Sequence, residues 1–203
     1  KLNSLFKKDR KGFEEKWNDI KVVIEYGMLS EDKFYDKADN FALYPTTDGE
    51  YFTFDELKEN IKDQQTDKDD KLVILYASEV DSQHSYIKQA KDKGYKVLLL
   101  DSPIIGHLIQ KMEGSKDKIS FARVDGDTLE NLIKKDETVI SKISDKEKEK
   151  LKPIIEDVVK EGGYTVQLEP LDSKSLPFVL TQPEFMRRMK EMQQTGGGGM
   201  MGN

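Results

Sequence analysis

The sequence predicts a mixed α/β fold: linking helices, then a small α/β/α layer with a parallel βαβ unit, then the first part of an α+β domain. Two short apolar runs, residues 71–77 and 95–101, are nearly continuous instead of alternating, which is typical of strands covered on both faces. The segment between them has helical spacing, with Tyr86, Ile87 and Ala90 on one side. Parallel strands need such a crossover, so we expect a parallel pair.

Composition narrows the classes of protein. The 203 residues allow one large domain or two small ones. Charged residues make up 35% of the chain and are mixed in sign, with a formal net charge of −6, so we expect neither a membrane segment nor a nucleic-acid partner. The chain has no cysteine, which excludes thiol catalysis and fits a cytoplasmic location. Its charged start lacks a signal peptide's apolar core, and we expect a piece of a longer protein.

The first part of the chain is expected to be helical. Apolar residues in the range 2–24 recur at helical spacing with an interruption near Gly12, which predicts a long amphipathic helix or a broken pair. Ser30 is expected to cap a further helix, which Pro45 would end.

A turn at Asp48 and Gly49 leads to the next predicted helix. Thr53 and Glu56 have the spacing of a capping box, in which each side chain accepts a hydrogen bond from the other residue's backbone N–H. The helix that they open is expected to run through Ile61.

Three further elements are expected after the second strand. Ser102 and Pro103 should begin a helix, because proline suits a first helical turn, and Gly114 should end it. Residues 119–124 alternate between apolar and polar, which predicts an edge strand, and residues 128–133 a short helical segment.

The composition changes near residue 134. Residues 134–150 are rich in lysine and acids, typical of a solvated helix surface. Ser144 and Glu147 form a second capping-box pattern, for a helix through Val159. Two strands around a polar turn are then predicted at residues 164–169 and 176–180.

No motif for catalysis or metal binding stands out. Ser85, Asp101 and His107 could form a hydrolase triad on paper, but no Gly-x-Ser-x-Gly surrounds any serine. Asp125 and Asp127 match only a fragment of a calcium loop, so a plain turn is favoured. No phosphate loop or dinucleotide fingerprint is found. We therefore assign no catalytic, cofactor-binding or metal-binding residue.

Ligands of open α/β sheets sit beyond the carboxyl ends of the strands, which here are Ser78, Glu79, Asp101 and Ser102. Caps and turns explain the same residues and are favoured. The strand-end residues nevertheless support an alternative function, that of a small α/β ligand-binding domain or enzyme.

The end of the chain is rich in methionine. Five of the seven methionines lie within residues 186–203, and Phe185, Met186, Met189 and Met192 follow one another at helical spacing. Methionine is unbranched and polarisable, so surfaces rich in it can repack around many partners. The cluster is either a binding surface or the cover of the second domain's core.

Four stretches carry a resemblance to a known family: TFDEL at residues 53–57, LVILYA at 72–77, KGYKVLLLDSPI at 93–104 and PEFMRRM at 183–189. In this order, and over essentially the whole chain, the sequence resembles bacterial members of the ninety-kilodalton heat-shock chaperone family. The resemblance implies that residues 1–143 are the distal part of a chaperone middle domain. Residues 144–203 would be the start of the C-terminal domain, before its dimerisation helices.

The family's activity implies a division of labour. Full-length members are cytoplasmic, homodimeric stress chaperones that bind ATP and magnesium and hydrolyse the ATP. The nucleotide site and the catalytic arginine would lie outside this chain, so the resemblance implies a non-enzymatic segment with no cofactor.

What remains is binding of unfolded or partly folded client proteins, together with linkage of the ATPase domain to the dimerisation domain. Family members bind clients with middle-domain surface and with an amphipathic helix that matches residues 185–194. The chain departs from many relatives near residues 105–107, where they carry acidic and aromatic residues. The client-binding candidates are Phe185, Met186, Met189, Met192, His107 and Gln110. A purely structural spacer is a third hypothesis.

Overall fold

The computed structural model describes residues 1–136, 141–171, 177–187 and 189. Contacts divide the chain into two compact units, which are described separately. Unit 1 contains Lys1–Lys134 together with the chain from Leu180 onward, and unit 2 contains Lys135–Val179. The predicted assignment of residues 1–143 and 144–203 to two domains stays a prediction. In the structure, the segment that begins at Leu180 belongs with the first unit.

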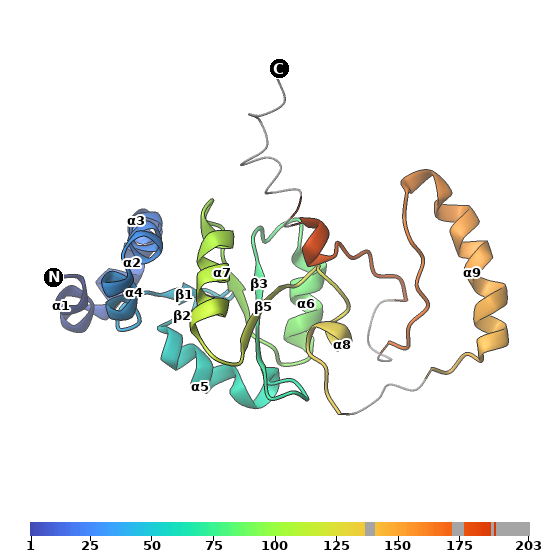
Figure 1. The fold of residues 1–203 in the computed structure, drawn as a ribbon, viewed down its shortest axis with the longest axis horizontal. Coiled ribbons are helices and arrows are strands. Elements are labelled where there is room, and N and C mark those ends of the chain that lie inside the picture. Colours follow the sequence, from blue (N-terminus) through green and yellow to red (C-terminus); the bar gives the residue numbers. More distant parts are fainter. Residues whose placement is uncertain (137–140, 172–176, 188, 190–203) are drawn as a thin grey trace, which may run out of the picture. The chain divides into compact units, whose positions relative to one another are not determined.

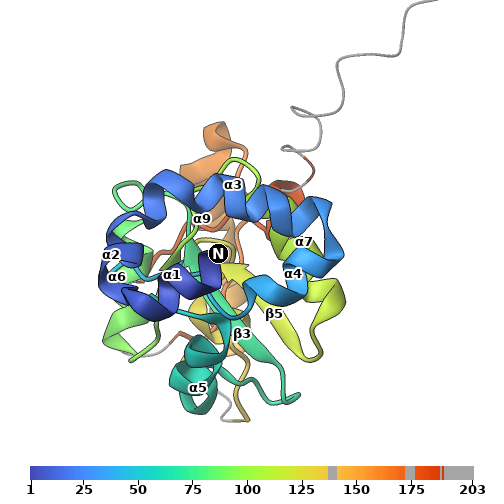
Figure 2. The ribbon, with the colours of Figure 1, turned by 90° about the vertical axis from the view of Figure 1, so that its left-hand side faces the viewer.

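Unit 1 begins with four helices that form one layer, which faces the viewer in Figure 2. Residues 2–24, predicted as one long helix or a broken pair, are broken twice. The first break is at Asp9, whose side chain caps the next helix by accepting a hydrogen bond from the Gly12 N–H at 2.9 Å, and the second is at Lys16. The helices are α1 (Leu2–Lys8), α2 (Arg10–Glu15), α3 (Trp17–Ser30) and α4 (Asp32–Ala38).

The predicted cap at Ser30 is wrong. Ser30 is the last residue of α3, and its hydroxyl donates to the Tyr26 carbonyl at 2.8 Å. Glu31 takes the N-cap position of α4 without a side-chain capping bond. Serine can satisfy either a helix start or the preceding turn of its own helix, and here α3 continues farther than its sequence pattern showed.

The turn and the capping box are confirmed. Gly49 has a φ of +81° between β1 (Tyr44–Pro45) and β2 (Tyr51–Phe52), which pair antiparallel. Thr53 and Glu56 then exchange both capping bonds and open α5, which spans Phe54–Gln65.

The parallel βαβ unit is also confirmed. The central strand β3 (Leu72–Ala77) pairs in parallel with β4 (Val97–Leu99) on one side and with β5 (Ile119–Arg123) on the other. Between the strands run α6 (His84–Asp92) and α7 (Ile105–Ser115), and α8 (Leu129–Leu132) follows β5. Gly94, with a φ of +80°, lies just beyond the end of α6.

The sheet is covered on both faces, as Figure 1 shows with α7 and α6 on opposite sides of β3 and β5. Leu72, Ile74 and Tyr76 belong to a core shared with α5, α7 and the first helices. The alternate residues Val73, Leu75 and Ala77 belong to a second core, with α6 and α8. Side chains of a strand alternate between faces, so two cores require the continuous apolar run seen in the sequence.

The start and the end of α7 differ from the prediction. The helix begins at Ile105 instead of Ser102 or Pro103, because Ser102 is buried and accepts hydrogen bonds from the following turn. Gly114 lies inside the helix, which ends one residue later. Glycine in a helix is unfavourable by only about 1 kcal/mol, which does not suffice to stop it here.

Unit 2 is built on α9 (Asp145–Val159), which the predicted capping box of Ser144 and Glu147 opens. A 3-10 turn (Lys160–Gly162) follows, and none of the α9 residues is buried in the described structure. The predicted strands are wrong as far as the described residues show, because residues 164–169 and 177–180 form no strand. They are mostly exposed, and a strand pair without a buried face is at best marginally stable.

Candidate functional site

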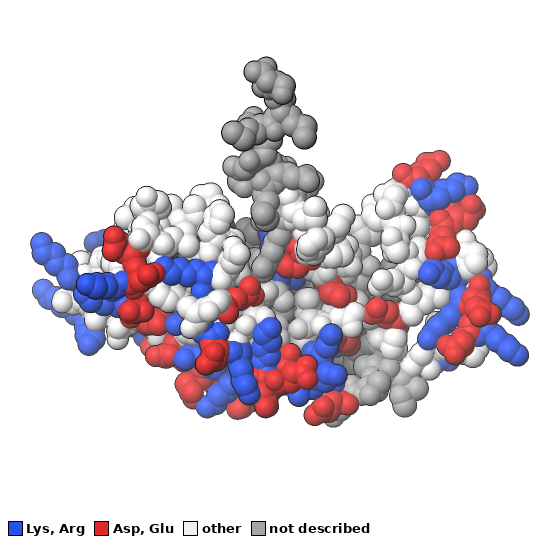
Figure 3. Space-filling view, in the orientation of Figure 1, with Lys and Arg blue, Asp and Glu red and all other residues white. Residues whose placement is uncertain are grey.

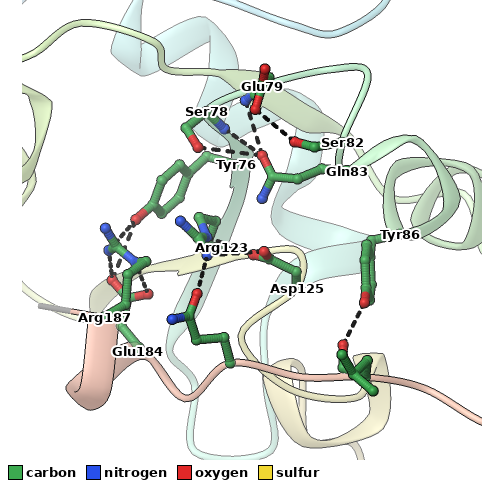
Figure 4. Close-up of polar contacts among 12 residues, drawn as sticks. Tyr76, Ser78, Glu79, Ser82, Gln83, Tyr86, Arg123, Asp125, Glu184 and Arg187 are labelled. Carbon is green, nitrogen blue, oxygen red and sulfur yellow. Dashed lines mark hydrogen bonds and ion pairs between the residues drawn. The ribbon is translucent and has the colours of Figure 1, made fainter. Parts of the chain in front are cut away.

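The candidate site is the segment of residues 180–187, which runs past the carboxyl ends of β3 and β5 (Figure 4). Its backbone is held at two places. The Gln182 N–H donates to the Asp125 carbonyl at 2.9 Å, and the Tyr86 hydroxyl donates to the Leu180 carbonyl. Arg123, at the end of β5, adds a bond from its guanidinium to the Gln182 side-chain oxygen at 3.2 Å.

A buried arginine holds the end of this segment. Arg187 is 9% exposed, and its guanidinium donates to the hydroxyl of Tyr76 at 2.8 Å and to the carboxylate of Glu184 at 3.0 Å. The Tyr76 hydroxyl in turn donates to Glu184 at 3.3 Å. Buried charges are tolerated in proteins when they are paired and hydrogen-bonded, and Arg187 meets both conditions. We call these three residues the clasp.

The candidate client-binding side chains lie on the other side of the same helical turn. Residues three apart share a helix face, so Glu184 and Arg187 both point to the sheet. Phe185 and Met186 are then turned to solvent, with 71% and 60% of their surface exposed, and Met189 is 43% exposed. The structure therefore brings three predicted residues together on one exposed apolar surface, which we call the apolar strip.

The remaining predicted residues lie elsewhere. His107 and Gln110 are exposed on α7 and belong to a different element from the apolar strip. Met192 lies outside the described residues. Sequence reasoning found the apolar strip from its methionines but missed Tyr76, Glu184 and Arg187. The spacing of Glu184 and Arg187 was a usable signal, whereas nothing in the sequence connected them to Tyr76.

The strand-end residues do not form a common site. The backbone N–H groups of Ser78 and Glu79 donate to the Gln83 side-chain oxygen at 2.8 and 3.0 Å, which closes a turn before α6. Asp101 pairs with Lys21 of α3. The favoured interpretation as caps and turns agrees with these contacts.

The acidic turn after β5 is likewise a plain turn. Asp125 accepts two hydrogen bonds from Arg123, at 2.6 and 2.9 Å, and Asp127 accepts bonds from Thr128 and Asn131. Within the described ranges, no three His, Asp or Glu residues are grouped so as to hold a metal ion. In the same part of the chain, no helix has the length and apolar character needed to cross a membrane.

One buried carboxyl was not predicted. Glu25 of α3 is 8% exposed and lines a cavity of about 10 Å³, roughly the room of one water molecule, together with Lys21 and Asp101. Burial raises the pKa of Glu25, while a hydrogen bond from Ser102 and the charge of Lys21 act in the opposite direction. Sequence spacing did not reveal this residue, because charged side chains are expected on the surface.

Charge is unevenly distributed over the visible face of unit 1. Figure 3 shows lysine, arginine and acidic side chains gathered over α5 and uncharged atoms over α3 and α7. The exposed large apolar residues of α3 are Val22, Val23 and Tyr26. Neither an anionic nor a cationic surface dominates, which agrees with the mixed signs of the sequence.

Comparison with known proteins identifies the family. The "Chaperone protein htpG" of Bacteroides fragilis (strain YCH46) is 43% identical to this chain over 201 residues, which is 98% of the chain. The "Chaperone protein HtpG" of Porphyromonas gingivalis (strain ATCC 33277) is 41% identical over the same share. The chain belongs to the HtpG chaperone family. It spans about 30% of the length of these curated relatives.

More distant comparisons add less. The middle domain of a Plasmodium falciparum heat shock protein matches 54% of this chain and 46% of its own, with a TM-score of 0.42 and 13% identity. No model of a known protein family matches the chain.

Proposed function

We propose that this chain is the client-binding part of a molecular chaperone and that it holds partly folded proteins through the apolar strip. The observation that carries the proposal is the exposure of Phe185 and Met186, 71% and 60%, on a turn whose Arg187 is buried. Soluble proteins normally turn the apolar side of a helix inward. Here the Glu184–Arg187 ion pair faces inward and the apolar side chains face outward. Such an exposed apolar surface is expected to bind a partner protein.

The chemistry of the strip suits partners of many sequences. Methionine and phenylalanine make dispersion contacts without directional requirements, and methionine adapts its shape to the surface it meets. Each contact is weak, so client affinity would come from several apolar residues that bind together. His107 and Gln110, exposed on α7, are proposed as a secondary polar contact.

The longer protein would add the ATP-dependent steps. We infer from the similarity to HtpG relatives that ATP and magnesium bind outside this chain, in a cytoplasmic homodimer. This chain would itself be non-enzymatic, and would connect the ATPase domain to the dimerisation domain. The support is the family membership together with the 30% share of the relatives' length that the chain spans.

Suppression of aggregation tests the client-binding proposal. A model protein is unfolded by heat in the presence of the chain, and light scattering is followed. The variant Phe185→Ser/Met186→Ser should lose most of the protection, because it removes the two most exposed apolar side chains of the strip. Thermal unfolding of the variant should remain within a few degrees of the unsubstituted chain, since exposed substitutions usually change stability by less than about 0.5 kcal/mol.

A matched control removes an exposed apolar residue elsewhere in unit 1. Val23→Ser on α3 changes a side chain that is 74% exposed and should leave protection intact. Equal loss of protection in both variants would refute a specific role for the strip. A large loss of stability in the double variant would show that these residues are part of the core.

A further inference from the structure

Residues 180–187 turn polar side chains toward the sheet and apolar side chains toward solvent. Glu184 and Arg187 face inward, whereas Leu180, Phe185 and Met186 are each at least 60% exposed. Figure 4 shows the polar contacts that join this segment to Tyr76, Tyr86 and Arg123. Directed hydrogen bonds from Tyr86 and Arg123 and to Tyr76 and Asp125 therefore attach the segment to the rest of unit 1.

The clasp determines which side of the turn faces outward. The guanidinium of Arg187 donates hydrogen bonds to both Tyr76 and Glu184. Because a guanidinium is planar and its N–H groups point in fixed directions, these bonds fix how the helical turn is rotated about the helix axis. Tyr76 is 2% exposed and lies in the core between the sheet and α7. Its hydroxyl is therefore a rigid reference point, placed by the strand, against which the turn is oriented.

We propose that Tyr76, Glu184 and Arg187 are positioning residues that hold the apolar strip outward, ready for a client. This proposal rests on the proposed function. It adds that the clasp controls the orientation of the client-binding strip. A surface that is already ordered loses less conformational freedom when a partner binds, and so it binds more tightly. When the clasp opens, the turn rotates freely and the strip is no longer presented as one surface.

Hydrogen–deuterium exchange without any client tests the clasp directly. Tyr76→Phe removes one hydroxyl and keeps the ring in its core position. Peptides that cover residues 180–187 should exchange about tenfold faster, the factor expected for loss of a hydrogen bond to a charged group. Peptides from β3 should keep their protection. Arg187→Lys, which retains the charge and loses the fork, should show the same local effect.

Tyr26→Phe serves as the matched control, because Tyr26 is 65% exposed on α3 and lies outside the clasp. It should change exchange nowhere in residues 180–187. Unchanged exchange in Tyr76→Phe would overturn the clasp. Faster exchange throughout unit 1, not only in residues 180–187, would also refute the clasp. Tyr76→Phe would then act only by lowering the stability of the whole unit.

Client binding separates the two proposals. Protection against aggregation should need roughly threefold more of the Tyr76→Phe chain than of the unsubstituted chain, because the strip must be ordered at each binding event. If exchange becomes faster while protection is unchanged, the positioning role is refuted and the proposed function stands. If the unsubstituted chain gives no protection, the proposed function fails, and the positioning role with it.

Discussion

Replacement of Glu25 by glutamine is expected to stabilise unit 1 at neutral and alkaline pH. Glu25 is 8% exposed, and its Oε2 atom is buried with no hydrogen-bond partner within the described residues. A carboxylate in this position loses its hydration without full compensation. Glutamine has almost the same shape but carries no charge, so Glu25→Gln removes the cost of burying the ion.

The magnitude follows from the unsatisfied oxygen. A buried polar group without a partner costs about 1–3 kcal/mol, and more when it is charged. Because the glutamine amide needs partners of its own, we expect the lower end, a gain of about 1 kcal/mol at pH 8. With a urea m-value of about 2 kcal/mol/M, the unfolding midpoint should rise by roughly 0.5 M.

The pH dependence gives a second signature. Burial raises the pKa of Glu25 above its usual value of 4.5, so the folded state keeps the proton at pH values where the unfolded state has lost it. Stability from this residue is therefore complete below about pH 4.5 and falls as the pH rises through the raised pKa. Glu25→Gln should abolish this fall, and its advantage should be larger at pH 8 than at pH 5.

Urea unfolding at pH 5 and pH 8 is the assay, with fluorescence of the single tryptophan, Trp17, as the probe. Trp17 is 2% exposed and lies on the same helix as Glu25. Glu15→Gln, an exposed position on α2, is the matched control and should change stability by less than about 0.5 kcal/mol at either pH. A Glu25→Gln variant that is less stable than the unsubstituted chain at pH 8 would refute the reasoning.

Three further predictions concern α5 and its ion pair with α2. The Arg10 guanidinium lowers the pKa of Glu56 to about 2, so stability from this pair should be complete above about pH 4.5 and be lost between pH 4.5 and 2; acid unfolding of Arg10→Met should lack this component. Thr53→Ala should cost about 1 kcal/mol in urea unfolding, whereas Thr53→Ser, which keeps the capping hydroxyl, should cost much less. Leu57→Ala, at a position 1% exposed, should cost about 2–5 kcal/mol, and Lys58→Ala should be nearly neutral in the same measurement.

Local patterns predicted much of the described structure because the forces involved are local. A capping box closes within four residues, and both Thr53 with Glu56 and Ser144 with Glu147 form as predicted. The apolar run of β3 predicted burial on both faces, which the two cores confirm. The methionine pattern left open whether the cluster covers a core or forms a surface, and the structure exposes Phe185 and Met186.

Other features could not be predicted because distant residues decide them. Whether Ser30 ends α3 or caps α4 depends on packing that its neighbours in sequence do not reveal. Residues 164–169 have a strand-like pattern, but a strand needs a partner edge, and the described structure provides none there. The burial of Glu25 results from α3 lying against the turn that contains Asp101 and Ser102.

The sequence by itself determined the fold class, the parallel βαβ unit and the apolar character of the strip, because hydrophobic periodicity and capping act over a few residues. Only the tertiary structure decided that the strip faces outward. That orientation depends on Tyr76 and Arg187, which are 111 positions apart in the chain and meet at 2.8 Å. Such a contact forms only after the strands have been placed, since Glu184 is a local partner of Arg187 but the Tyr76 hydroxyl is supplied by the folded sheet.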